Sequence, residues 1–137
     1  MSDTSQFRQA ISSSTKLMGA GLNEQALGLL DDAIAEAMRQ HESLWTLTLC
    51  HHAAVIADSL GNLQLQRRYY GESLASNSEN PRALYGLADV ARRLGEHEIA
   101  KEYAARSYEA ILRSDDEIIR QGLLDLVLKH WPELEKK

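Results

Sequence analysis

The sequence has one cysteine, two prolines and no apolar run near the roughly 20 residues that a membrane-spanning helix needs. A single cysteine excludes an intrachain disulfide framework. The net charge of −5 at pH 7 lacks the basic surplus that nucleic-acid binders show. Residues 1–6 have neither the basic start nor the apolar core of a secretory signal. We therefore expect a cytoplasmic protein that binds neither membranes nor nucleic acid.

The composition that remains favours helices. Alanine and leucine dominate the apolar 44% of the chain, and β-branched residues are scarce. Apolar residues recur at helical spacing in seven stretches, which polar or glycine-containing turns separate. The expected helices span residues 6–17, 23–38, 43–60, 62–74, 81–94, 99–111 and 115–130.

Residues that can satisfy the free amides of a helix start precede most of these stretches. Proline is also favoured at the first helical position, because its missing N–H has no partner there in any case. The expected caps are Asn23, Ser43, Asn62, Asn80 with Pro81 behind it, and a capping box of Ser114 and Glu117.

One pattern is written twice in the centre of the chain. Leu60-Gly61 is followed 34 residues later by Leu94-Gly95, and the same shift lays Ala54 on Ala88 and Ala88 on Gly122. A fixed period in the thirties is typical of solenoids built from helix pairs. We expect the small residues at 54, 88 and 122 to let neighbouring helices approach closely.

These columns resemble the tetratricopeptide repeat family, whose 34-residue helix–turn–helix has a small residue in its first helix and a glycine at its turn. The resemblance implies an all-α fold, a right-handed superhelical solenoid of antiparallel pairs with about seven helices. The alternative is an irregular helical bundle without repeat geometry. The best-matching positions are Leu84, Leu87, Ala88, Leu94-Gly95, Ala100 and Ala104.

The resemblance covers nearly the whole chain as one domain, residues 1–137. Its first repeat is degenerate, since Gly21 lies 40 residues before Gly61 and six residues are therefore extra. The expected parts are a degenerate repeat at 6–42, repeats at 43–79 and 80–113, and a capping helix at 114–131.

In the tetratricopeptide family the first helices of successive pairs line a groove that holds a segment of a partner protein. The resemblance therefore implies a protein–protein interaction module with a scaffold or adaptor role, without a cofactor. Tyrosine and arginine are frequent interface anchors, and the alternative is a merely solvated polar face. The expected groove residues are Arg8, Ile11, Thr15 and Met18, then Thr48, His51, Val55 and Asp58, then Arg82, Tyr85, Asp89 and Arg92.

Other candidate sites are weaker. Cys50, His51, His52 and Asp58 form the one metal-like cluster, but adjacent histidines on a helix diverge, and two ligands on one face do not make a metal site. No nucleophile–base pair or phosphate-binding loop points to an enzyme. The run of residues 67–70, Arg-Arg-Tyr-Tyr, fits a solvated helix face better than a nucleic-acid patch.

The last expected helix is more apolar than a terminal cap, whose outer face should be polar. Either the segment with Trp131 and Leu134 folds back over this helix, or the apolar surplus is an interface between copies of a self-assembling chain. The second reading predicts an oligomer interface at Ile119, Leu123, Leu126 and Trp131.

Overall fold

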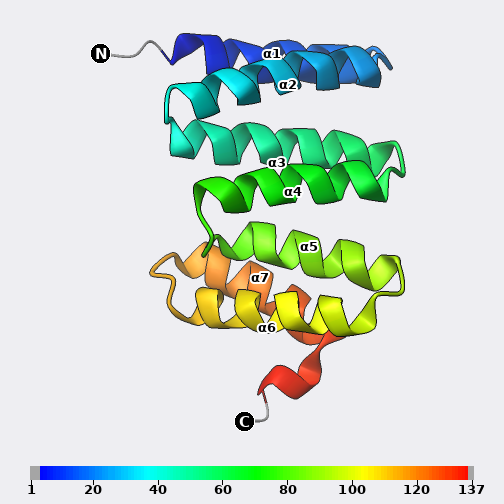
Figure 1. Ribbon diagram of the computed structural model, residues 1–137, viewed down its shortest axis with the longest axis vertical. Helices are drawn as coiled ribbons and strands as arrows, with labels where there is room; N and C mark the ends of the chain where they lie inside the picture. Colours follow the sequence, from blue (N-terminus) through cyan, green and yellow to red (C-terminus); the bar gives the residue numbers. More distant parts are fainter. Residues whose placement is uncertain (1–3, 136–137) are drawn as a thin grey trace. The chain divides into compact units, whose positions relative to one another are not determined.

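A computed structural model describes residues 4–135 and confirms that the chain is all-α (Figure 1). Seven α-helices and one short 3-10 helix account for its regular structure, and residues 4–135 contain no strand. None of the helices in this range has both the length and the apolarity needed to cross a membrane. The helices are α1 (Ser5–Gly19), α2 (Asn23–Arg39), α3 (Ser43–Ser59), α4 (Leu63–Ser76), α5 (Pro81–Arg93), α6 (His97–Leu112) and α7 (Glu117–His130), followed by η1 (Pro132–Glu135).

The helices belong to two compact units. Unit 1 ends at Ser76 and contains α1 to α4, and unit 2 begins at Asn77 and contains α5, α6, α7 and η1. Within each unit, successive helices run antiparallel and are joined by short turns (Figure 1). In unit 2, α7 packs against both α5 and α6.

Four of the turns end a helix with a residue in the left-handed conformation. Three of these residues are glycines, Gly21, Gly61 and Gly95, with φ of 78°, 68° and 81°. The fourth is His41, with φ of 57°. In each turn the next N–H donates to the carbonyl five residues earlier at 2.8–3.0 Å, which satisfies a carbonyl of the last helical turn. The sequence predicted the glycine turns but not that His41 adopts the same conformation.

The six residues that separate the first repeat from the 34-residue period lengthen two helices. Moving the end of α4 back by 40 gives residue 36, yet α2 continues to Arg39. Moving the start of α5 back by 34 gives residue 47, yet α3 begins at Ser43. The surplus is therefore absorbed as helix, and the intervening turn stays short.

Each unit has its own apolar core. The core of unit 1 is built around Phe7, Leu30, Leu49 and Tyr69, and the core of unit 2 includes Ile111 and Val127. Buried residues recur three or four positions apart along each helix, as an amphipathic helix requires.

The expected column of small residues is only partly correct. Ala54 and Ala88 are fully buried, in agreement with close helix approach. Gly122 is exposed, and a side chain there would meet nothing within 4 Å. The prediction for Gly122 is wrong because no described segment packs on that face of α7.

Two of the expected caps are confirmed and two are wrong. The Asn62 and Asn80 side chains accept hydrogen bonds from the amides of Leu65 and Ala83 at 3.0 and 2.8 Å. Asn23 and Ser43 instead lie inside their helices, each one residue after the cap position. The preceding turns fix this offset, because the residue after the left-handed one becomes the cap.

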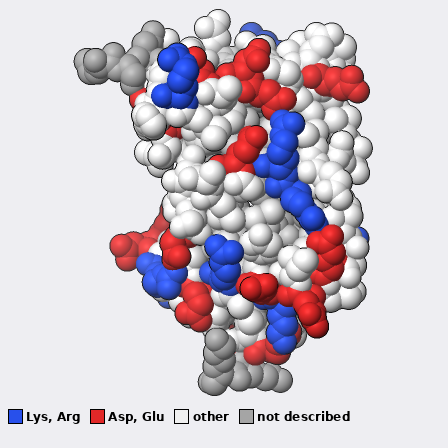
Figure 2. Space-filling view, viewed as in Figure 1, with Lys and Arg blue, Asp and Glu red and all other residues white. Residues whose placement is uncertain are grey.

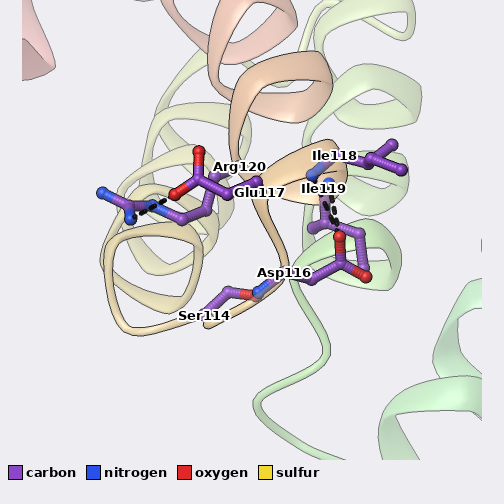
Figure 3. Close-up of polar contacts among 6 residues, drawn as sticks. All are labelled: Ser114, Asp116, Glu117, Ile118, Ile119 and Arg120. Carbon is purple, nitrogen blue, oxygen red and sulfur yellow. Dashed lines mark hydrogen bonds and ion pairs between the residues drawn. The ribbon is translucent and has the colours of Figure 1, made fainter.

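The start of α7 also differs from the predicted capping box (Figure 3). Asp116 is the cap, and its carboxylate accepts from the amides of Ile118 and Ile119 at 3.0 and 3.2 Å. Ser114 accepts from the Asp116 amide at 3.2 Å, and Glu117 forms an ion pair with Arg120. The capping box fails because an aspartate two residues after the serine satisfies the free amides first.

This correction can be tested by comparing two substitutions. Asp116→Ala removes the side-chain acceptor of two helix amides, and we expect it to lower the free energy of unfolding of unit 2 by about 1 kcal/mol. Ser114→Ala should have a smaller effect, since it removes only a bond within the turn. Urea denaturation followed by circular dichroism measures both. A larger loss for Ser114→Ala would restore the predicted capping box.

Candidate functional site

In unit 1 the predicted groove residues lie on α1 and α3, two helices that are in contact. Five of the six, all except the partly buried His51, are exposed. The hydroxyls of Thr15 and Thr48 donate to backbone carbonyls four residues earlier, both at 2.9 Å. Each hydroxyl therefore keeps acceptor capacity toward solvent, and the face presents mixed polar and apolar groups. The exposed residues are Arg8, Thr15, Thr48, Val55 and Asp58.

In unit 2 the predicted groove residues form a connected polar face on α5. Asp89 accepts from the Arg92 guanidinium at 2.7 Å and also pairs with Arg93 at 3.7 Å. Arg82 is exposed, and Tyr85 is partly buried against the core of unit 2. One carboxylate thus stands between two guanidinium groups, which leaves a positive surplus at this part of the helix.

Arg92 is held in one orientation but is not fully satisfied. Its Nη2 donates to Asp89, while its Nε is buried and has no hydrogen-bond partner within residues 4–135. A buried N–H without an acceptor is costly. An acceptor supplied by a bound molecule would remove that cost.

His130, at the end of α7, belongs to the same cluster. Burial lowers the pKa of His130, and the nearby Arg92 lowers this pKa further, while Asp89 opposes the shift. Burial and Asp89 both raise the pKa of Tyr85. At neutral pH the cluster therefore presents a neutral imidazole and a protonated phenol beside the Asp89–Arg92 pair. Hereafter we call Tyr85, Asp89, Arg92 and His130 the α5–α7 cluster.

Sequence reasoning found the α5 part of this cluster but missed His130. Helical spacing alone groups Tyr85, Asp89 and Arg92, because they lie on one helix. His130 is 38 residues beyond Arg92 and joins them only through the packing of α7 on α5. The available signal was that the last helix continues the 34-residue period.

The predicted oligomer interface on α7 is largely inside unit 2. Leu123 and Trp131 are only 7% and 6% exposed, and Ile119 is partly buried against the same core. Of the four predicted residues, Leu126 alone is exposed, at 42%. Leu134 is 5% exposed, so the segment after α7 folds back over the core as one of the two expected arrangements required. For Leu123 and Trp131 the interface prediction is wrong.

The metal-like cluster on α3 has the properties of a helix packed into a core. Cys50 is buried, and its burial raises the pKa of the thiol to about 12, so it stays protonated at neutral pH. A thiolate is the form that binds metal. Among residues 4–135, no three His, Cys, Asp or Glu side chains come together as a metal site would need.

The run of residues 67–70 is engaged within unit 1. Arg68 donates to Asp31 of α2 at 2.7 Å and lies 4.6 Å from the centre of the Tyr69 ring. Tyr69 is fully buried, and its hydroxyl donates to the same carboxylate oxygen at 2.7 Å. Figure 2 shows acidic and basic side chains interspersed with uncharged areas on the face viewed there, rather than a basic field.

Comparison with known proteins adds no family to this description. No protein-family model matches the sequence, and no curated protein matches it.

Proposed function

We propose that the chain is a tetratricopeptide-like helical-repeat protein that binds a segment of another protein. The proposed binding surface includes the α5–α7 cluster, and the proposed role is that of a scaffold or adaptor without enzymatic activity. The helical solenoid geometry that the resemblance implies is part of this proposal.

The observation that carries the proposal is the incompletely satisfied Arg92. Its guanidinium is fixed by Asp89, its Nε lacks an acceptor, and the half-buried Tyr85 stands one turn away on the same helix. Pre-oriented arginine and tyrosine side chains at the edge of a core are the groups that most often dominate binding energy at protein interfaces. Fixing them in advance also reduces the side-chain entropy lost on binding.

The chemistry of the cluster favours a polar partner segment. A neutral His130 and a protonated Tyr85 can each donate or accept a hydrogen bond, and Arg82 and Arg92 offer charged donors. A partner carboxylate or backbone carbonyl could supply the acceptor that the Arg92 Nε lacks. The acidic Asp89 makes a purely acidic partner less favourable than a segment of mixed charge.

Substitutions on α5 test this proposal directly. We expect Arg82→Ala and Tyr85→Ala each to weaken partner binding at least about tenfold, as is typical for interface anchors. The tagged chain would be used for affinity capture with mass spectrometry, and the candidate partner would then be purified and titrated by calorimetry.

The matched control is Arg106→Ala on α6, which also removes an exposed arginine, one that lies 5.5 Å from the centre of the Tyr103 ring. Each variant must first show an unchanged helical spectrum and melting curve. Unaltered binding by both α5 variants, or equal weakening by the Arg106 control, would count against the proposed surface.

A further inference from the structure

The outer face of α7 has the largest exposed apolar side chain of unit 2. Ile118 is 85% exposed, the highest value among the large hydrophobic residues of the described chain, and Leu126, two turns later, is 42% exposed. Between them lies Gly122, which is exposed and would meet nothing within 4 Å if it carried a side chain. Residues four apart lie on one ridge of a helix, so Ile118, Gly122 and Leu126 form one continuous strip.

This strip has the shape that helix packing uses. A glycine between two larger apolar residues makes a shallow saddle, into which a second helix can approach closely. Apolar side chains as exposed as Ile118 gain the most by being covered, since the gain scales with the area removed from water.

We propose that the occupant of this strip is the α7 helix of a second copy of the chain, antiparallel to the first and crossing it at Gly122. In such a symmetric pair, residues equally far before and after Gly122 face each other. Ile118 and Leu126 are each four residues from Gly122, so each Ile118 faces Leu126 of the second copy.

Charge complementarity singles out this arrangement. Asp115 and Lys129 are each seven residues from Gly122, so the same symmetry sets Asp115 of one copy opposite Lys129 of the other, twice per dimer. Both are exposed, and neither forms an ion pair within residues 4–135. A parallel pair would instead place Asp115 against Asp115 and Lys129 against Lys129, where like charges repel. One helix face is a small interface, so the dimer is weak and forms at high protein concentration.

The inference is independent of the partner-binding surface proposed above. The sequence-based interface on the last helix included Leu123 and Trp131, which are buried in unit 2. The face proposed here shares only Leu126 with that set.

Sedimentation velocity from low micromolar to near-millimolar concentration tests the dimer on the full chain. The average mass should rise from one chain toward two with increasing concentration. Ile118→Glu should weaken the dimer at least about tenfold, because it puts a charge into each apolar contact. The monomer should stay folded, since Ile118 is highly exposed and a glutamate is favourable in the first turn of a helix. The matched control is Leu44→Glu in unit 1, where Leu44 is 79% exposed, and it should leave dimerisation unchanged.

A charge exchange distinguishes a second copy from any other occupant. Asp115→Lys and Lys129→Asp should each weaken the dimer, and the double variant should restore it, because it re-creates the two opposed pairs with their signs reversed. Melting curves of the single variants check that each monomer is folded. A chain that stays monomeric at near-millimolar concentration, a dimer that survives Ile118→Glu, equal weakening by Leu44→Glu, or a double variant that does not recover would each overturn the proposal. A different protein bound to this face of a monomeric chain would overturn it as well.

Discussion

Replacing Tyr69 with alanine is expected to lower the free energy of unfolding of unit 1 by about 3–5 kcal/mol, as is typical of large aromatic residues in cores. Tyr69 is the largest fully buried side chain of the described chain. Its removal leaves a cavity and deprives Asp31 of the hydroxyl that donates to it at 2.7 Å. Because small domains are stable by only about 5–15 kcal/mol, this loss should lower the melting temperature by more than about 10 °C.

The matched control for this substitution is Tyr69→Phe. Phenylalanine keeps the ring in the core and loses only the hydrogen bond to Asp31, so the expected loss is about 1–2 kcal/mol. Urea denaturation monitored by circular dichroism measures both variants. If Tyr69→Ala left the stability of unit 1 unchanged, the side chain would belong to an exposed surface, and the nucleic-acid patch considered for residues 67–70 would regain support.

The features that sequence reasoning predicted correctly are those that depend on neighbours along the chain. Gly61 and Gly95 could be identified as turn residues because the left-handed conformation costs other residues more than glycine. Asn80 with Pro81 was predictable for a similar reason, since the cap and the first helical residue are adjacent. His41 was missed because a histidine can take the same conformation at an energetic cost, and composition does not reveal where that cost is accepted.

The features that were missed depend on packing between distant residues. Tyr69 and Asp31 are 38 residues apart, and the shared hydrogen bond requires that α2 and α4 lie at a particular separation. Gly122 matched the small-residue column in register, but its role depended on whether a further helix covers α7. His130 likewise joined the α5–α7 cluster only through the packing of α7. A one-dimensional period assigns residues to columns, and it does not say which columns are covered at the end of the chain.

The last helix illustrates how one ambiguous pattern separates into two surfaces. Its apolar residues point in several directions, so the sequence allowed either a core or an interface. The structure assigns Leu123, Val127 and Trp131 to the core of unit 2 and leaves Ile118 and Leu126 exposed. A substitution at Trp131 therefore has a different expected result from one at Ile118.

We expect Trp131→Ala to destabilise unit 2 by about 3–5 kcal/mol. Trp131 is 6% exposed and lies in the core cluster with Leu134, so its removal opens a cavity between α7 and the segment that folds back on it. Hydrogen exchange of the α7 amides measures the loss within unit 2. The remaining tryptophan, Trp45, packs against the core of unit 1, and its fluorescence should report an unchanged unit 1.

Glu133→Ala is the matched control, because it alters the same short segment without touching the core. Glu133 forms one ion pair, with Lys101 at 3.7 Å, and both side chains are about half exposed. Exposed pairs of this kind contribute little, so the control should stay within about 0.5 kcal/mol of the parent. If Trp131 lay in an interface between copies, Trp131→Ala would abolish self-association and leave the unfolding of the monomer unaltered. A core role predicts the reverse at low protein concentration, where the chain is monomeric: a large loss of stability that does not depend on concentration.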